Sequence, residues 1–120
     1  MSAETDFRAL LAGHAGTVAL VGGAIAHNAI GPSVAPPYVV FTAQHDRALG
    51  LDNTLLADSC VITVQCWSKT AAQAESVADA VTAAVATAPA ARGACVTVRA
   101  SGYDEDTGLD ATVLTVEWWA

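Results

Sequence analysis

Few residues of this chain are of the types that carry out chemistry, and the first candidate is His45 beside Asp46. They form the one adjacent imidazole–carboxylate pair in the sequence. Such a dyad acts in catalysis only with a nucleophile or an oriented substrate. The sequence has no Gly-x-Ser-x-Gly elbow or comparable nucleophile motif. We therefore interpret the pair as polar residues of a solvated loop and predict no catalytic residue.

Three cysteines, Cys60, Cys66 and Cys95, are the candidates for a metal or redox site. No two of them have Cys-x-x-Cys spacing, and an odd number argues against a disulfide scaffold. On one strand, Cys60 and Cys66 would lie about 20 Å apart, too far to hold the same metal. No histidine spacing completes a zinc site. We predict reduced thiols that pack as small hydrophobic groups, with no metal and no other cofactor.

The acidic run Asp104–Asp106 is the third candidate, because its carboxylates and the following glycine are similar to the start of a calcium loop. A complete loop also needs further oxygen ligands and a bidentate glutamate at its twelfth position. The glutamate that follows, Glu117, falls in a predicted strand. A hairpin turn with Gly108 at a positive-φ position explains the run better.

The charge of the chain excludes two classes of partner. Twelve acidic and five basic residues give a net charge of -7 over 120 residues. Binding to nucleic acid or to an anionic membrane needs clustered cations, which five scattered ones do not supply. Only 14% of the residues are charged, against about 25% in an ordinary domain. This low fraction favours a surface that becomes buried against other chains.

A membrane span must also be considered, because residues 9–45 contain no Asp, Glu, Lys or Arg. The stretch Leu10–Ile30 is about long enough to cross a bilayer, but two histidines, an asparagine and four glycines interrupt it. A secretory signal begins with basic residues, whereas Glu4 and Asp6 are acidic. We expect a helical hairpin with buried faces and no contact with a membrane.

Apolar periodicity and turn residues divide the chain into helices and strands. A chain of this length provides one core, so we predict a single domain over residues 1–120. Residues 45–58 are interpreted as a polar-edged loop or as an extended hairpin arm. The expected elements are a helix from Thr5-Asp6 to Gly13, a short helical turn Thr17–Val21, strands Tyr38–Gln44 and Ser59–Trp67, a helix Thr70–Ala88, and strands Cys95–Tyr103 and Leu109–Trp119.

Alternation within the strands predicts which side chains face the core. The buried face of Ser59–Trp67 is expected to hold Cys60, Ile62, Val64 and Cys66. One face of the next strand is expected to hold Val96, Val98 and Ala100. The predicted fold class is α+β: a mostly antiparallel four-stranded sheet with helices packed on one face.

The two C-terminal tryptophans must point to opposite faces of a strand. One of Trp118 and Trp119 can therefore join the core, while the other lies on the open face or at an interface. An exposed tryptophan is a favoured anchor in protein interfaces.

Six segments, in order along the chain, resemble a known family. They are D-F-R-A-L-L (Asp6–Leu11), V-G-G-x-I (Val21–Ile25), P-P-Y-V-V-F (Pro36–Phe41), V-x-x-V-Q-C-W (Val61–Trp67), A-x-x-x-A-D-A-V (Ala74–Val81) and D-E-D-T-G-L (Asp104–Leu109). Together they are similar to the small tail completion, or tail terminator, proteins of long-tailed bacteriophages and gene transfer agents.

This resemblance implies a structural and non-enzymatic role in the virion tail. Such proteins form a hexameric ring that caps the tail tube and joins it to the head–tail connector. The expected partners are other copies of the chain, the tail tube protein and the connector protein. DNA would pass through the lumen without specific binding, since an acidic lining repels phosphates. The expected location is the neck of the virion, and the host cytoplasm during assembly, where the free subunit is expected to be monomeric.

Eight residues are candidates for contacts between subunits or with partners. They are Arg47, Leu49, Leu51, Leu55, Asp104, Glu105, Asp106 and Trp119. The leucines could instead cover the end of the core, and the acidic tip could instead be a solubilising turn. The alternative function, from a different class, is a small ligand-binding or accessory α+β domain that acts as a dimer.

Overall fold

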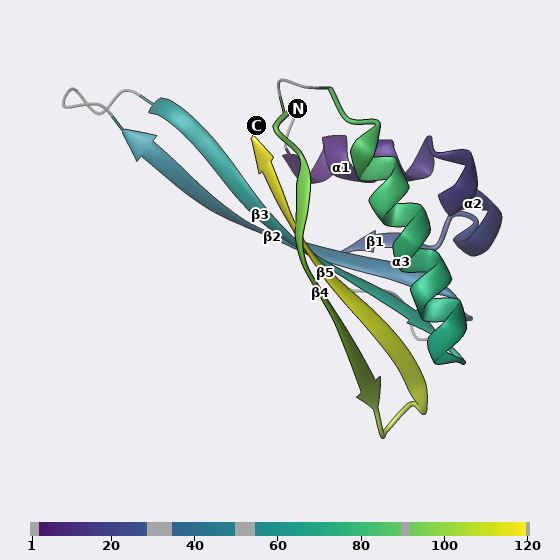
Figure 1. Ribbon diagram of the computed structural model, residues 1–120. Helices are drawn as coiled ribbons and strands as arrows, with labels where there is room; N and C mark the ends of the chain where they lie inside the picture. Colours follow the sequence, from purple (N-terminus) through teal and green to yellow (C-terminus); the bar gives the residue numbers. More distant parts are fainter. Residues whose placement is uncertain (1–2, 29–34, 50–54, 90–91, 120) are drawn as a thin grey trace.

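The fold is seen in a computed structural model that describes residues 3–28, 35–49, 55–89 and 92–119. A layer of helices covers one face of a twisted sheet (Figure 1). The elements are α1 (Ala3–Ala12), α2 (Ala15–Val21), β1 (Ile25–His27), β2 (Tyr38–Leu49), β3 (Leu55–Ser68), α3 (Ala71–Ala86), β4 (Cys95–Asp104) and β5 (Leu109–Trp119).

The sheet has five strands in the order β1-β2-β3-β5-β4. β1 runs parallel to β2, and every other neighbouring pair is antiparallel. The α+β class and the single helical layer are confirmed, but the predicted number of strands is wrong, since the sheet is mixed and five-stranded. β1 was missed because its three residues are too few to show a period of two. It is held beside β2 by backbone pairing and by His27, whose ring stacks on Phe41.

Helix α3 forms as its sequence predicts. The Thr70 hydroxyl caps its first turn by accepting a hydrogen bond from the Gln73 N–H at 3.1 Å. The buried stripe recurs at helical spacing and packs on the sheet. Its members are Ala74, Val77, Ala78, Val81, Ala84 and Val85.

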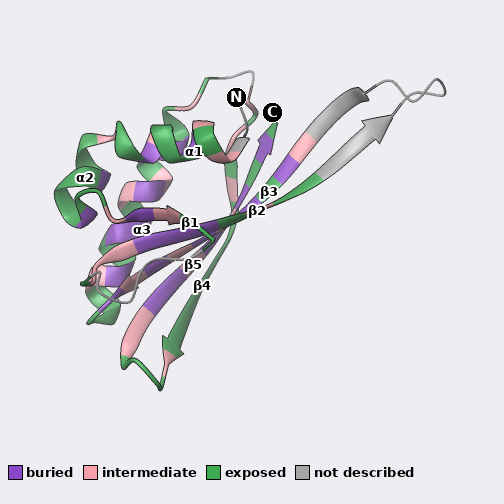
Figure 2. Cartoon of the chain, turned by 180° about the vertical axis from the view of Figure 1, so that it is seen from behind, coloured by how far each residue is buried: buried purple, intermediate pink, exposed green. Residues whose placement is uncertain are grey.

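The core lies between the helices and the covered face of the sheet, and Figure 2 shows the buried residues gathered there. The predicted buried face of β3 is confirmed, since Cys60, Ile62, Val64 and Cys66 are all buried. Phe7 of α1 is fully buried in this core. Its ring meets Phe41 edge-on at 5.2 Å and Trp118 at 5.8 Å between centroids.

The face assignment of β4 is wrong for Val98 and Ala100. The pairing of β4 with β5 shifts between Val96 and Val98, so Thr97 is an extra residue in the ladder. Such a bulge reverses the alternation of every residue after it. Val98 therefore turns to the open face, where it is 54% exposed, and Arg99 turns to the helical side, where it contacts α3.

Residues 45–58 include an extended arm of the sheet, the second of the two predicted alternatives. β2 and β3 remain paired from Tyr38 and Trp67 to Leu49 and Leu55. The partner strand β5 ends at Trp119 opposite Ser59, so the last residues of the β2–β3 hairpin continue alone. Figure 1 shows this hairpin projecting beyond the helices. His45 thus belongs to a strand and not to the solvated loop that we predicted.

Candidate functional site

The predicted contact residues of the arm lie near its end. Arg47 pairs with Asp58, and Leu49 pairs with Leu55 at a shift in register. The side chains of these residues and all of Leu51 lie outside the described part of the structure. The backbone places Arg47, Leu49 and Leu55 on one pair of strands, and their role in contacts stays a prediction.

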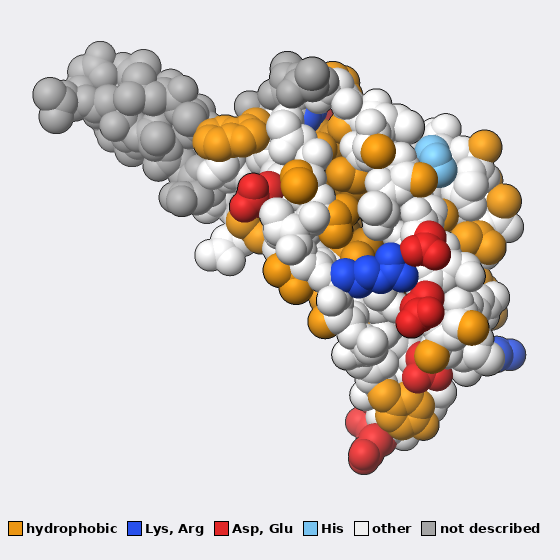
Figure 3. Space-filling model, viewed as in Figure 1, with side chains coloured by type: hydrophobic (Ala, Val, Ile, Leu, Met, Phe, Trp, Pro, Cys, Tyr) orange, Lys and Arg blue, Asp and Glu red, His pale blue; other side chains and the backbone are white. Residues whose placement is uncertain are grey.

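The acidic tip joins β4 to β5 at the opposite end of the sheet. The Asp104 carboxylate accepts a hydrogen bond from the Asp106 N–H at 3.0 Å. The Asp104 carbonyl accepts another from the Gly108 N–H at 2.8 Å. Gly108 has φ of +69°, as the turn prediction requires. Asp104 therefore has a structural role in the turn, whereas Glu105 and Asp106 are exposed and give the tip its negative charge (Figure 3).

The tryptophan pair divides as predicted. Trp118 is 2% exposed in the core, and its indole N–H has no hydrogen-bond partner among the described residues. Trp119 is 47% exposed on the other face. Its ring lies so close to Gly93 that a Cβ there would be 2.8 Å from the Trp119 Cδ1. Arg92 also holds this end of β5, because its guanidinium donates to the Trp119 carbonyl at 3.4 Å.

The open face of the sheet, which no described helix covers, is almost free of charge. Three rows of paired residues cross β2, β3, β5 and β4 on this face, and Glu117 is the one charged member among them. The rows are Gln44, Val61, Glu117 and Cys95; Thr42, Thr63, Thr115 and Val98; and Val40, Gln65, Val113 and Ala100. A sheet face of threonines and small apolar groups can be buried against protein at little desolvation cost.

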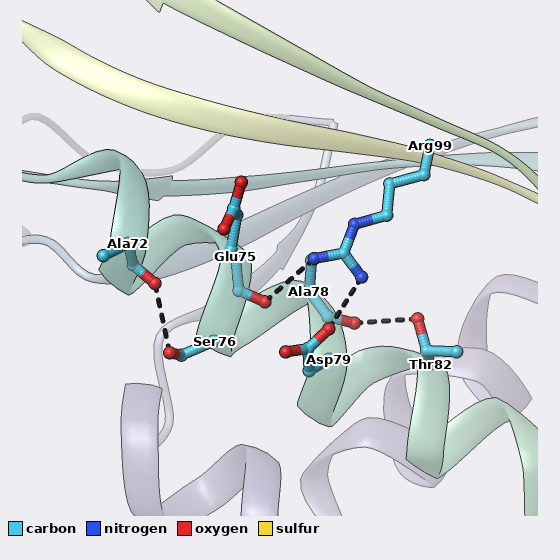
Figure 4. A network of polar contacts seen from close by, with 7 residues as sticks. All are labelled: Ala72, Glu75, Ser76, Ala78, Asp79, Thr82 and Arg99. Atoms are coloured by element: carbon cyan, nitrogen blue, oxygen red, sulfur yellow. Dashed lines mark hydrogen bonds and ion pairs between the residues drawn. The ribbon is translucent and has the colours of Figure 1, made fainter.

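Ion pairs fix the helical layer on the other face. Arg99 of β4 donates to the Asp79 carboxylate at 2.7 Å and to the Glu75 carbonyl at 3.3 Å (Figure 4). Arg92 reaches Asp6 of α1 at 3.3 Å. These contacts tie β4 and the segment before it to α3 and α1.

A third pair joins α1 to the base of the arm. His45 Nε2 lies 2.7 Å from the Glu4 Oε1. The hydrogen bond from His45 lowers the pKa of Glu4 below its usual value. The histidine that we considered for catalysis with Asp46 is thus engaged by a different carboxylate, from a helix 41 residues away in sequence.

The cysteines do not form a site in the described residues. Cys60 and Cys66 are buried, and Cys95 is exposed. Burial raises the pKa of Cys66 to about 12, so its thiol stays protonated. No group of His, Cys, Asp and Glu side chains in the described segments could hold a metal ion. No helix among them is long and apolar enough to cross a membrane.

The geometry of the described residues is therefore that of a scaffold: a helical layer, an open face with few charges, and two hairpins that extend from it. A family model described as tail completion protein gp17 matches residues 5–120. The chain belongs to this family. As a tail completion protein it is structural and not an enzyme, in agreement with the prediction from its sequence.

A solved structure supports the fold of this tail completion protein. A chain of a structure titled "Virion of native gene transfer agent (GTA) particle" has a TM-score of 0.72 and 19% sequence identity. The match covers 94% of this chain and 90% of the other. A comparison with curated proteins gives no match.

Proposed function

We propose that the chain is the terminator of a phage-type tail, which closes the finished tail tube as a ring and joins it to the head connector. The observation that carries this proposal is the gp17 family match over residues 5–120. The likeness to a chain of a gene transfer agent virion supports it through the fold. We expect six copies in the ring, a number that comes from the family resemblance alone.

The surface of the chain is suited to assembly. The three rows on the open face can meet another protein without the burial of more than one charge, Glu117. The acidic balance of the chain is suited to a lumen that DNA must cross, because like charge prevents the phosphates from adhering. A ring with a neutral or basic bore would contradict this role of the charge.

A particle assay tests the proposal. The gene is deleted from a producing strain and supplied in trans, and particles are counted by electron microscopy. Without the protein we expect filled heads and separate tails, and with it joined particles that carry a ring at the neck. Normal joined particles in the deletion strain would overturn the proposal.

For the ligand-binding alternative, the described residues offer cavities of modest size. The larger of the two described cavities has a volume of about 370 Å³, near the low end for small-molecule sites. It lies between α1 and the segment that follows α3, and the Asp6–Arg92 ion pair forms part of its wall.

A further inference from the structure

Both borders of the sheet carry strand edges that no described strand covers. β4 forms one border over its whole length, and Figure 2 shows it exposed almost throughout. At the other border β1 pairs with β2 at Val39–Phe41. From Thr42 onward, β2 has no described strand on its outer side. Uncovered edges of this length are normally blocked by lysine, proline or a bulge, because they bind other strands.

On β4, the feature that would hinder pairing with another strand, a bulge, lies near one end of the strand. The bulge lies at Val96–Val98, and from Val98 to Gly102 the ladder is regular. This stretch contains no lysine or proline, and its one charge, Arg99, is already paired with Asp79. On β2, Thr42–Gln44 is uncharged. Two copies with a charge of -7 each can therefore approach along these edges without contact between their acidic groups.

The directions of the strands make the two edges complementary. Following the sheet order, β2 and β5 run one way and β3 and β4 the other. A copy rotated about an axis roughly along the strands keeps these directions, so its β2 would lie antiparallel to β4. The contact joins two different surfaces, and this is the type of contact that generates rings.

We propose that β4 of one copy pairs with the part of β2 that begins at Thr42 in the next copy, so that one continuous sheet passes around the ring. This inference rests on the proposed function. In a continuous sheet, the open-face residues of both copies must lie on the same face. Pairing with a second copy can begin only at Thr42, because β1 already pairs with β2 before that residue. Two registers meet these conditions and keep the whole regular stretch Val98–Gly102 opposite β2. The one with the smaller displacement places Gly102 opposite the neighbouring copy's Thr42 and Ala100 opposite its Gln44.

This register has a stagger that is known from a closed sheet. The row that starts at Val40 crosses four strands to Ala100 and continues to the neighbouring copy's Gln44. The row is thus displaced by four residues over four strands. A displacement of about one residue per strand is that of the closed TIM barrel, whose strands tilt by about 36°.

Cysteine cross-linking in assembled particles tests the register. In a Cys95→Ser background, Gln44→Cys and Ala100→Cys are combined in the full chain, and particles are purified by complementation. Cross-strand Cα separations of about 5 Å permit a disulfide. We expect a ladder of covalent multimers on a non-reducing gel. The matched control, Gln44→Cys with Ser101→Cys, places the thiols on opposite faces and should give at least tenfold less product.

The outcomes separate the inference from the proposed function. If the protein is present in joined particles but the Gln44–Ala100 pair gives no multimers, the strand pairing is wrong and the terminator role stands. Equal cross-linking by the control would also overturn the pairing. If wild-type protein is absent from purified particles, the proposed function fails, and the inference fails with it. Selective multimers from the Gln44–Ala100 pair support both.

Discussion

At the scale of single residues, the contacts between α1 and the sheet include one polar pair and one aromatic group. Glu4 and His45 meet at 2.7 Å at the base of the arm, while Phe7 lies between Phe41 and Trp118 in the core. The aromatic contacts contribute more to the free energy of unfolding than the polar pair does, because a partly exposed ion pair contributes little. The polar pair instead makes stability depend on pH.

Replacement of Glu4 by Gln should reveal this dependence. A carboxylate whose pKa is lowered by folding contributes stability above the ordinary glutamate pKa, and that stability is lost as the pH falls through the lowered value. We therefore expect Glu4→Gln to reduce Tm at about pH 6 and to match the wild type at about pH 2. The measurement is thermal unfolding across this range. Glu75→Gln, which removes the same charge from α3, is the control, and an identical pH dependence in both variants would contradict the assignment.

Val77 tests the packing of α3 at the same scale. Its side chain is fully buried against the sheet, so Val77→Asp places an unpaired carboxylate in the core at a cost of several kcal/mol. We expect the variant to be largely unfolded at room temperature by circular dichroism. Ala83→Asp changes an exposed position of the same helix and should melt close to wild type. A Val77→Asp variant with wild-type Tm would show that α3 is misplaced.

At the scale of elements, prediction from sequence succeeded where one face is buried and regular, and failed where a strand departs from regularity. The alternation of Cys60 to Cys66 and the stripe of α3 place β3 and α3 correctly. The bulge at Thr97 leaves no mark in the residue pattern, so Val98 was assigned to the wrong face. The position of His45 opposite Glu4 depends on long-range packing of α1, which no local pattern encodes.

The acidic hairpin tip is the element with two open interpretations, and the structure favours the simpler one. Because Asp104 is already bonded within the turn, we expect the tip to act as a solubilising turn. Asp104→Asn, Glu105→Gln and Asp106→Asn together keep an acceptor for the turn and remove the charge. Particle yield and head–tail joining should then stay normal in a complementation assay. Free heads and free tails with a folded variant would instead show that the tip contacts a partner.

At the scale of the whole molecule, the two extended hairpins and the single helical layer leave much of the sheet uncovered. The proposed pairing joins two different edges, β4 of one copy and β2 of the next. In this proposal each copy contacts its two neighbours through different edges, so several copies would be arranged around one axis. A tube tip that holds the copies together raises their effective concentration.

The free protein is accordingly expected to be monomeric. Sedimentation velocity at about micromolar concentration should give one species with the mass of a single chain, 12.2 kDa. Addition of purified tails should transfer the protein to the tail fraction. A stable dimer at every concentration would contradict this expectation and would favour the ligand-binding or accessory class of function.

The neighbouring positions of Trp118 and Trp119 also provide two fluorophores in opposite environments. Trp118 is buried with its ring against Phe7, so its emission reports on unfolding and is protected from collisional quenchers. Trp119 lies on the open face and is accessible to acrylamide. Half-buried Trp67 adds an emission of its own, which Trp67→Phe removes. A protein added to tail tips would then lose the quenchable part of its emission as the open face becomes covered, and this signal would follow assembly in real time without an attached dye.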